Sequence, residues 1–255
     1  MEDIRIFCEN DRDYKKVPPG ITLKELSETL DGNADFLAAL VDNKLKGLDY
    51  RIMQQHNIRF IGYEHPDGRR TYIRSLCFVL QNAVSELFPG KILAIDYSLP
   101  SGLYCEIREA APLEDGRPDV YFATDEELGT LKNRMREIIA ADLPFSKVKM
   151  SFEEASKLYS AKNQTEKVHL MHSLERFTYS VYFLDGKADT FYGPLTPTTG
   201  CLDAFDIMGF NDGFCLQYPM DGDPGRVLPM KRQSKLATAL KEHSDWCSVM
   251  RVKGV

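Results

Sequence analysis

The sequence predicts an α+β protein with a small N-terminal domain and a larger second domain. In residues 1–63 the apolar side chains follow the order strand, strand, helix, strand, strand, whereas residues 64–218 mix capped helices with separate strands. With 255 residues, 43% of them hydrophobic, the chain is long enough to bury two cores. We expect a linker and a C-terminal helix in residues 219–255.

The N-terminal domain is predicted to open with a β-hairpin around the polar turn at residues 10–13. Thr22 then stands where a helix N-cap would lie, and Glu25 follows three residues later, which is the pattern of a capping box. Residues 36–41 and 58–63 supply two more strands. This order of elements is that of a small β-grasp domain.

The second domain is predicted to begin after a polar stretch at residues 64–70. The helix expected at residues 73–88 is apolar on most sides, so we expect it to be buried. The remaining elements are strands at 91–97 and 101–107, capped helices that begin after Thr124 and Ser151, a strand at 177–184, and a closing hairpin formed by 201–208 and 213–218.

Residues 219–234 are rich in Gly, Pro and Asp, which indicates a linker, and residues 235–246 show the pattern of a further helix. No apolar run approaches the roughly 20 residues of a membrane span, and the N-terminus lacks a basic region followed by an apolar core. We therefore expect no membrane partner and a cytoplasmic location. The six cysteines form no C-x-x-C pair, which favours reduced, buried thiols over a metal or disulfide framework.

The formal net charge of −6 is unevenly distributed along the chain. Counting Asp, Glu, Lys and Arg gives −2 for residues 1–63, −7 for 64–215 and +3 for 216–255. A protein that grips a phosphate backbone usually carries a basic stripe, so the acidic middle region weighs against tRNA binding and leaves local basic patches open.

Two stretches carry a resemblance to a known site. Residues 189–200 read DTFYGPLTPTTG, in the frame of D-x-C-x-G-P-H-x-x-x-T-G, and residues 73–84 read IRSLCFVLQNAV, in the frame of H-S-x-x-H-x-L-x-x-A-V. These are the two halves of the editing site in threonyl-tRNA synthetases and related alanyl-type domains, which the second domain therefore resembles.

The resemblance keeps the frame of that site and loses its metal-type ligands. The two helix histidines are replaced by Arg74 and Phe78, and the loop cysteine and histidine by Phe191 and Leu195, so that only Asp189 keeps its place. Arg, Phe and Leu supply no donor for a metal ion, and a lone carboxylate forms no acid/base pair. We expect no catalytic residue and no metal ligand in this vestigial pocket.

The vestigial pocket would either be filled by side chains or hold a small ligand. Phe and Leu in place of polar ligands favour a filled, dry core. An ion pair between Arg74 and Asp189 is expected as a remnant of the polar site.

The N-terminal domain resembles the TGS domain, which occurs in threonyl-tRNA synthetase and in several regulatory proteins. The likeness lies in PPGITLKELSETL, ALVDNKLKGLDYRI and NIRFIGY, with residues 41–45 at the position of a V-N-G-x-L turn. The resemblance implies binding of a nucleotide or RNA without direct chemistry. Candidate contacts are Arg12, Lys15, Lys16 and Lys24, although a solvated face explains these residues equally well.

The order of the domains, together with the tail K-L-x-x-x-L-x-E-x-x-x-W, resembles the N-terminal half of a bacterial uridine kinase family. That resemblance implies a noncatalytic regulatory or ligand-binding region whose partner is its own P-loop kinase domain beyond Val255. ATP and Mg²⁺ would belong to that domain, because residues 1–255 contain no G-x-x-x-x-G-K-[S/T] motif. The alternatives are a freestanding RNA- or tRNA-binding module, or a vestigial editing module that deacylates mischarged tRNA.

Overall fold

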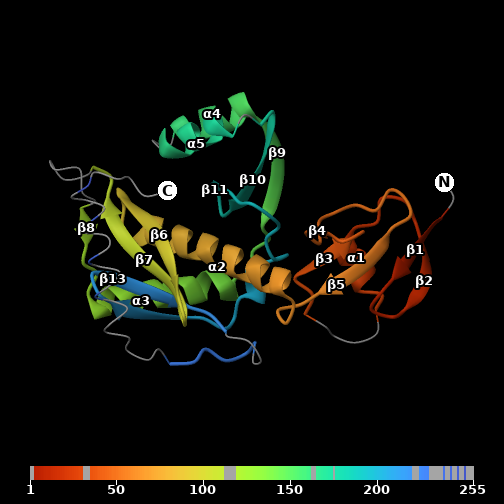
Figure 1. The fold of residues 1–255 in the computed structure, drawn as a ribbon, viewed down its shortest axis with the longest axis horizontal. Coiled ribbons are helices and arrows are strands. Elements are labelled where there is room, and N and C mark those ends of the chain that lie inside the picture. The colour runs from red at the N-terminus through yellow and green to blue at the C-terminus, as the bar shows by residue number, and fades with distance from the viewer. Residues whose placement is uncertain are drawn as a thin grey trace. The chain divides into compact units, whose positions relative to one another are not determined.

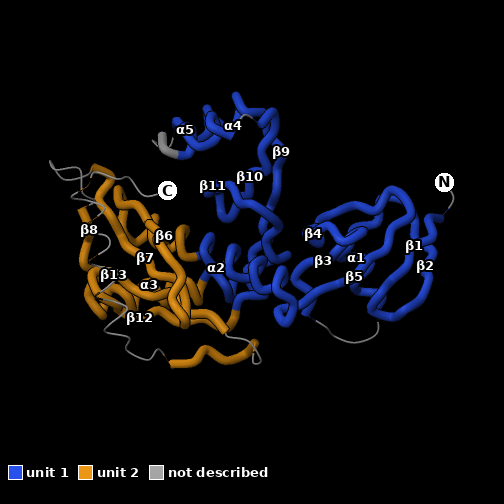
Figure 2. Tube along the Cα trace, viewed as in Figure 1, with its two compact units in different colours: residues 1–79, 138–202 blue, residues 80–137, 203–255 orange. Residues whose placement is uncertain are grey.

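The computed structural model describes residues 3–30, 35–111, 119–161, 165–174, 176–219 and 224–229, with single positions at 238, 242, 246 and 250. Within these ranges the fold is α+β, as predicted (Figure 1). The chain forms two compact units, one made of residues 1–79 and 138–202 and the other of 80–137 and 203–255 (Figure 2). The predicted domain boundaries at residues 63 and 218 stay predictions, and the helix expected at 235–246 lies outside the described residues except at single positions.

The N-terminal part of the first unit is a five-stranded sheet in the order β2-β1-β5-β3-β4, packed against helix α1 (Figure 1). Strands β1 and β5 are parallel and the other pairs are antiparallel, which is the predicted β-grasp arrangement. The elements are β1 (Ile4–Cys8), β2 (Asp13–Val17), α1 (Leu23–Ser27), β3 (Ala38–Val41), β4 (Lys44–Lys46) and β5 (Asn57–Ile61).

Local sequence signals account for the shape of this domain. Thr22 accepts a hydrogen bond from the Glu25 amide while the Glu25 carboxylate accepts one from the Thr22 amide, so the predicted capping box is confirmed. Asp42 and Asn43 have φ values of 47° and 61°, the pair of left-handed residues that a tight two-residue hairpin needs between β3 and β4. The apolar face of α1 is buried in the core of the sheet through Leu23 and Leu26.

Helix α2 (Pro66–Leu87) begins seven residues earlier than predicted, so the polar link expected at residues 64–70 is wrong over most of its length. Proline suits the first turn of a helix because its fixed φ is already helical and its missing amide has no partner there. Gly68 allows the close approach of the helix to the preceding strand, since a Cβ at this position would lie 1.9 Å from the carbonyl oxygen of Gly62.

A second, three-stranded sheet in the first unit has the order β11-β10-β9 and carries helices α4 and α5 (Figure 1). The predicted capping box of Ser151 and Glu154 is confirmed at the start of α4. Helix α5 was not predicted from the sequence. The elements are β9 (Ser146–Ser151), α4 (Phe152–Ser160), α5 (Thr165–Ser173), β10 (Thr178–Leu184) and β11 (Lys187–Thr190).

The second unit contains a sheet in the order β12-β13-β7-β6, with β8 paired to β7. Helix α3 begins after Thr124, whose hydroxyl accepts from the Glu127 amide, and Arg134 on α3 donates to Glu86 at 2.7 Å. The closing hairpin starts at Asp206 instead of residue 201, because residues 199–201 form a short 3₁₀ turn. The elements of the second unit are β6 (Lys91–Leu99), β7 (Gly102–Glu109), β8 (Val120–Tyr121), most of α3 (Asp125–Ala140), β12 (Asp206–Phe210) and β13 (Gly213–Gln217), whereas η1 (Thr199–Cys201) belongs to the first unit.

Across the described ranges, no helix combines the length and the apolar character needed to cross a membrane.

Candidate functional site

The two stretches that the sequence singled out meet in the first unit, where helix α2 packs against the loop after β11. Phe78 on α2 is 1% exposed and Leu195 on the loop is 4% exposed. The Phe78 ring lies 5.2 Å from the ring of Phe191 and stacks at 5.9 Å on that of Phe145. Three positions that the resemblance assigns to metal-type ligands therefore carry apolar side chains, of which Phe78 and Leu195 are buried and Phe191 is partly buried.

Arg74, one turn before Phe78 on α2, holds the loop by its backbone. Its Nε and Nη2 donate to the carbonyl oxygen of Pro194 at 3.2 and 3.1 Å. Gly193 has φ +127°, and a Cβ there would lie 2.9 Å from the Arg74 guanidinium carbon, so this position requires glycine. Desolvation lowers the pKa of Arg74 from its usual value, yet a guanidinium stays charged at neutral pH.

The expected ion pair between Arg74 and Asp189 is wrong. Asp189, which is 5% exposed at the end of β11, instead accepts from Lys167 Nζ on α5 at 2.6 Å. The physical reason is that the Pro194 carbonyl already takes the guanidinium, whereas α5 brings an ammonium group directly to the carboxylate. Sequence reasoning missed Lys167 because it missed α5. One general rule could have pointed to a missing lysine: a carboxylate in a buried position, such as Asp189, needs a cation beside it.

Other members of the loop motif shape the backbone. Tyr182 donates to the Gly193 carbonyl at 3.1 Å, and the Thr196 amide donates to Ser75 on α2 at 2.8 Å. The Thr199 hydroxyl donates to the carbonyl of Ile138 at 2.9 Å. The polar residues kept from the motif thus hold the loop on its supports and leave no free nucleophile among them.

The described part of the chain offers no ligand set for a metal ion, since no group of three or more His, Cys, Asp or Glu side chains converges there. Cys77, beside Phe78, is desolvated strongly enough to raise the pKa of its thiol to about 12. A thiol with this pKa stays protonated at neutral pH and is a poor nucleophile. Among the described residues of the site, the side chains offer no ligand set for a water-activating metal, and Cys77 is not a reactive thiol.

Two cavities lie beside the loop. The first, which we call the Asp189 cavity, measures about 460 Å³ and is lined by the Lys167–Asp189 pair together with Phe191 and Tyr192. The second, the Lys147 cavity, also measures about 460 Å³ and lies between the β-grasp sheet and β9–β10. They share the lining residues Ser180, Phe191 and Gly193, so the two cavities adjoin.

The Lys147 cavity is markedly basic. Its charged lining consists of four cations and one carboxylate, namely Lys46, Arg51, Lys147, Lys149 and Asp49. Asp49 lies 3.4 Å from Lys147 Nζ, and half of its side chain is exposed. Aromatic rings of Tyr50, Tyr182 and Phe191 stand among the cations. Such an arrangement can neutralise phosphates and stack unpaired bases.

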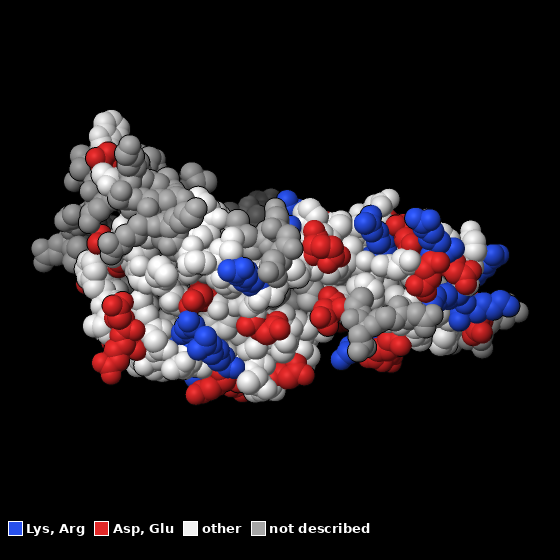
Figure 3. All heavy atoms as spheres, turned by 90° about the horizontal axis from the view of Figure 1, so that it is seen from below, with Lys and Arg blue, Asp and Glu red and all other residues white. Residues whose placement is uncertain are grey.

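The candidate RNA contacts named from the sequence do not form one cluster. Arg12 lies in the turn after β1, and Lys15 and Lys16 lie on β2, at the opposite edge of the sheet from β4. Lys15 is paired with Asp11 at 2.6 Å. Lys24 instead lines a smaller cavity of about 240 Å³ that also includes Lys147. Figure 3 shows basic and acidic side chains interspersed on one face, including its N-terminal end.

Known proteins similar to this chain include threonine–tRNA ligases. The ligase of Carboxydothermus hydrogenoformans is 27% identical over 199 residues, which are 77% of this chain and 30% of the ligase. The ligase of Acetivibrio thermocellus is 28% identical over 200 residues, and that of Syntrophomonas wolfei is 26% identical over 211 residues, or 82% of this chain. No protein-family model matches the chain. The chain spans about 30% of the length of these relatives, and their identity lends no support to a link with uridine kinase.

Proposed function

We propose that this chain is a noncatalytic module that binds the single-stranded 3′ end of a tRNA beside the loop at residues 189–200. The observation that carries this proposal is the basic, aromatic Lys147 cavity, which adjoins the Asp189 cavity. Similarity to threonine–tRNA ligases supports tRNA as the ligand. A tRNA-binding role also agrees with the cytoplasmic location expected from the sequence.

Hydrolysis of an aminoacyl ester needs an activated water and a group that stabilises the developing charge. In this site the former ligand positions are packed with Phe78, Phe191 and Leu195, and Arg74 is held by a backbone carbonyl. The packing supports binding without deacylation.

Binding has several contributors in the same place. Lys147 and Lys149 lie two residues apart on β9 and both line the Lys147 cavity; Lys147 Nζ is 3.4 Å from the half-exposed Asp49, a pair that an entering phosphate can displace. Asp189 offers a carboxylate, paired with Lys167 Nζ at 2.6 Å, that can accept hydrogen bonds from the terminal ribose hydroxyls. The acidic balance of residues 64–215 is thus compatible with a local basic patch.

The test is fluorescence anisotropy of a labelled tRNA acceptor minihelix with an unpaired 3′ end. We expect the Lys147→Ala/Lys149→Ala variant to bind roughly tenfold more weakly, and its log–log salt slope to be shallower by about 1.4, since each phosphate contact to a single strand contributes about 0.7. The matched control is Lys15→Ala/Lys16→Ala, which removes two lysines from the far edge of the sheet. Equal affinity of the wild type and the Lys147→Ala/Lys149→Ala variant would refute the proposed site.

A regulatory role beside a uridine kinase stays a prediction from the domain order. The test of this role is to sequence the gene past Val255 and to assay the resulting protein for ATP-dependent phosphorylation of uridine.

A further inference from the structure

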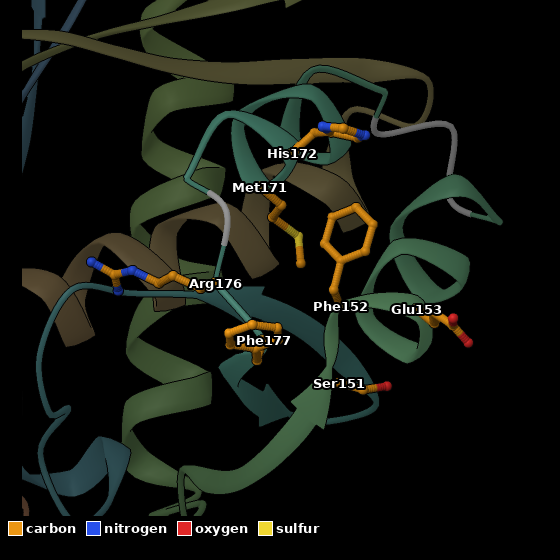
Figure 4. Close-up of a pocket in the computed structure, with 7 residues that line it drawn as sticks. All are labelled: Ser151, Phe152, Glu153, Met171, His172, Arg176 and Phe177. Atoms are coloured by element: carbon orange, nitrogen blue, oxygen red, sulfur yellow. The ribbon is translucent and has the colours of Figure 1, made fainter.

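Another cavity lies where α4, α5 and the start of β10 come together, and we call it the Phe152 cavity. It measures about 450 Å³ and is lined by Ser151, Phe152, Glu153, Met171, His172, Arg176 and Phe177. Figure 4 shows the side chains of Phe152 and Met171 directed into the centre, with Phe177 below them and the carboxylate of Glu153 turned away. The His172 ring meets Phe152 edge-on at 5.6 Å.

The rim of this cavity exposes aromatic surface. Phe177 is 93% exposed, although burying a phenylalanine side chain is worth about 2 kcal/mol or more. Next to it, the exposed Arg176 places its guanidinium 5.5 Å from the ring of Tyr192, which is itself 63% exposed. An aromatic ring beside an arginine is the combination that single-stranded nucleic acids use for stacking.

The Phe152 cavity continues the two cavities beside the loop. It shares Met171 and Arg176 with the Asp189 cavity, which in turn shares Phe191 and Gly193 with the Lys147 cavity. The three cavities are therefore adjacent, each bordered by residues that also line the next.

We propose that the Phe152 cavity is a nucleobase subsite, in which an unpaired base of the bound RNA stacks on Phe177 and an adjoining phosphate meets Arg176. This inference rests on the proposed RNA-binding function and adds a base-binding position to it. Figure 4 shows the guanidinium of Arg176 and the carboxylate of Glu153 directed away from the centre on opposite sides, and Arg176 also lines the Asp189 cavity, so its charge lies on the side from which the RNA would arrive.

The experiment measures binding of the same minihelix, with a fluorescent purine analogue placed at each overhang position in turn. We expect Phe177→Ala to weaken binding about tenfold, since stacking of one base on an aromatic side chain has this magnitude. It should leave the salt slope unchanged and abolish the quenching of the analogue at one position. Phe177→Tyr should retain both the affinity and the quenching. The matched control is Phe122→Ala, which removes an aromatic side chain that is 64% exposed in the second unit.

The outcomes separate this subsite from the proposed function. If Lys147→Ala/Lys149→Ala weakens binding but Phe177→Ala behaves as Phe122→Ala does, RNA binding stands and the base subsite is overturned. If the wild type does not bind the minihelix above a neutral control protein, both are overturned. A third outcome is possible in sedimentation: the wild type dimerises as its concentration rises, Phe177→Ala abolishes the dimer, and the RNA affinity does not change. This result would assign the rim to a contact with a second copy of the chain and would also overturn the subsite.

Discussion

Replacing Lys167 with methionine removes the partner of a buried carboxylate and leaves an unbranched apolar side chain that is one atom shorter. The Asp189 side chain is 8% exposed and accepts from Lys167 at 2.6 Å. Breaking a buried ion pair at one side typically costs about 3–5 kcal/mol, because the remaining charge stays buried. The Lys167 side chain is 30% exposed, so water screens part of this cost, and we expect a loss of about 2 kcal/mol.

The assay is equilibrium unfolding in urea followed by far-ultraviolet circular dichroism. Lys149→Met is the matched control, because it removes an exposed lysine from β9 in the same unit. The double variant Lys167→Met/Asp189→Leu should recover most of the lost stability, since replacing both charges of a buried pair by apolar groups is often nearly neutral. A loss for Lys167→Met no larger than that of Lys149→Met would show that the pair does not stabilise the fold and would refute this reasoning.

Three further predictions follow from the loop and the caps. Gly193→Ala should lower the free energy of unfolding by about 2 kcal/mol, because Gly193 has a φ of +127° and the Arg74 guanidinium lies next to it. The matched control, Gly186→Ala, has a positive φ but open space around it and should cost about 1 kcal/mol. Equal losses for the two variants in urea unfolding would contradict this prediction. Capping hydrogen bonds lower the pKa of Glu25 and Glu154, so their stabilisation is present above the ordinary pKa of 4.5 and is lost as pH falls through the lower folded value. Stability measured from about pH 6 to pH 3 should therefore fall less steeply in the corresponding Gln variants, and an unchanged pH profile would count against the caps. Mischarged seryl-tRNA should persist in the presence of the protein, and robust deacylation that Asp189→Ala abolishes would show that the site is catalytic.

Short-range signals in the sequence were sufficient for much of the fold. The capping boxes at Thr22 and Ser151 act within four residues, and the left-handed pair Asp42-Asn43 defines its hairpin locally. The motifs at residues 73–84 and 189–200 likewise predicted that helix α2 and the loop lie together, because the glycine and proline positions of the motif indicate the shape of the backbone.

What the sequence could not predict depends on distant partners. The early start of α2 is permitted by the contact between Gly68 and Gly62, which no helical periodicity reveals. The choice of Lys167 over Arg74 as the partner of Asp189 depends on the placement of α5, whose apolar residues show little one-sided pattern. The cations of the Lys147 cavity come from two distant parts of the chain: Lys46 and Arg51 from β4 and the loop after it, and Lys147 and Lys149 from β9. A charge count along the sequence could not detect this cluster, because only the fold brings the two parts together.

The hydrogen bond between Arg74 and the Pro194 carbonyl joins residues that are 120 positions apart, so it bears on the order in which parts of the protein fold during synthesis. The β-grasp strands end at Ile61 and can pair soon after they leave the ribosome, whereas the loop that Arg74 holds is synthesised much later. Until then the guanidinium has only Thr71, on its own helix, and water as partners. The loop at residues 189–200 is thus held in place late in synthesis, and a chain that stops before residue 194 carries the β-grasp strands without the proposed site.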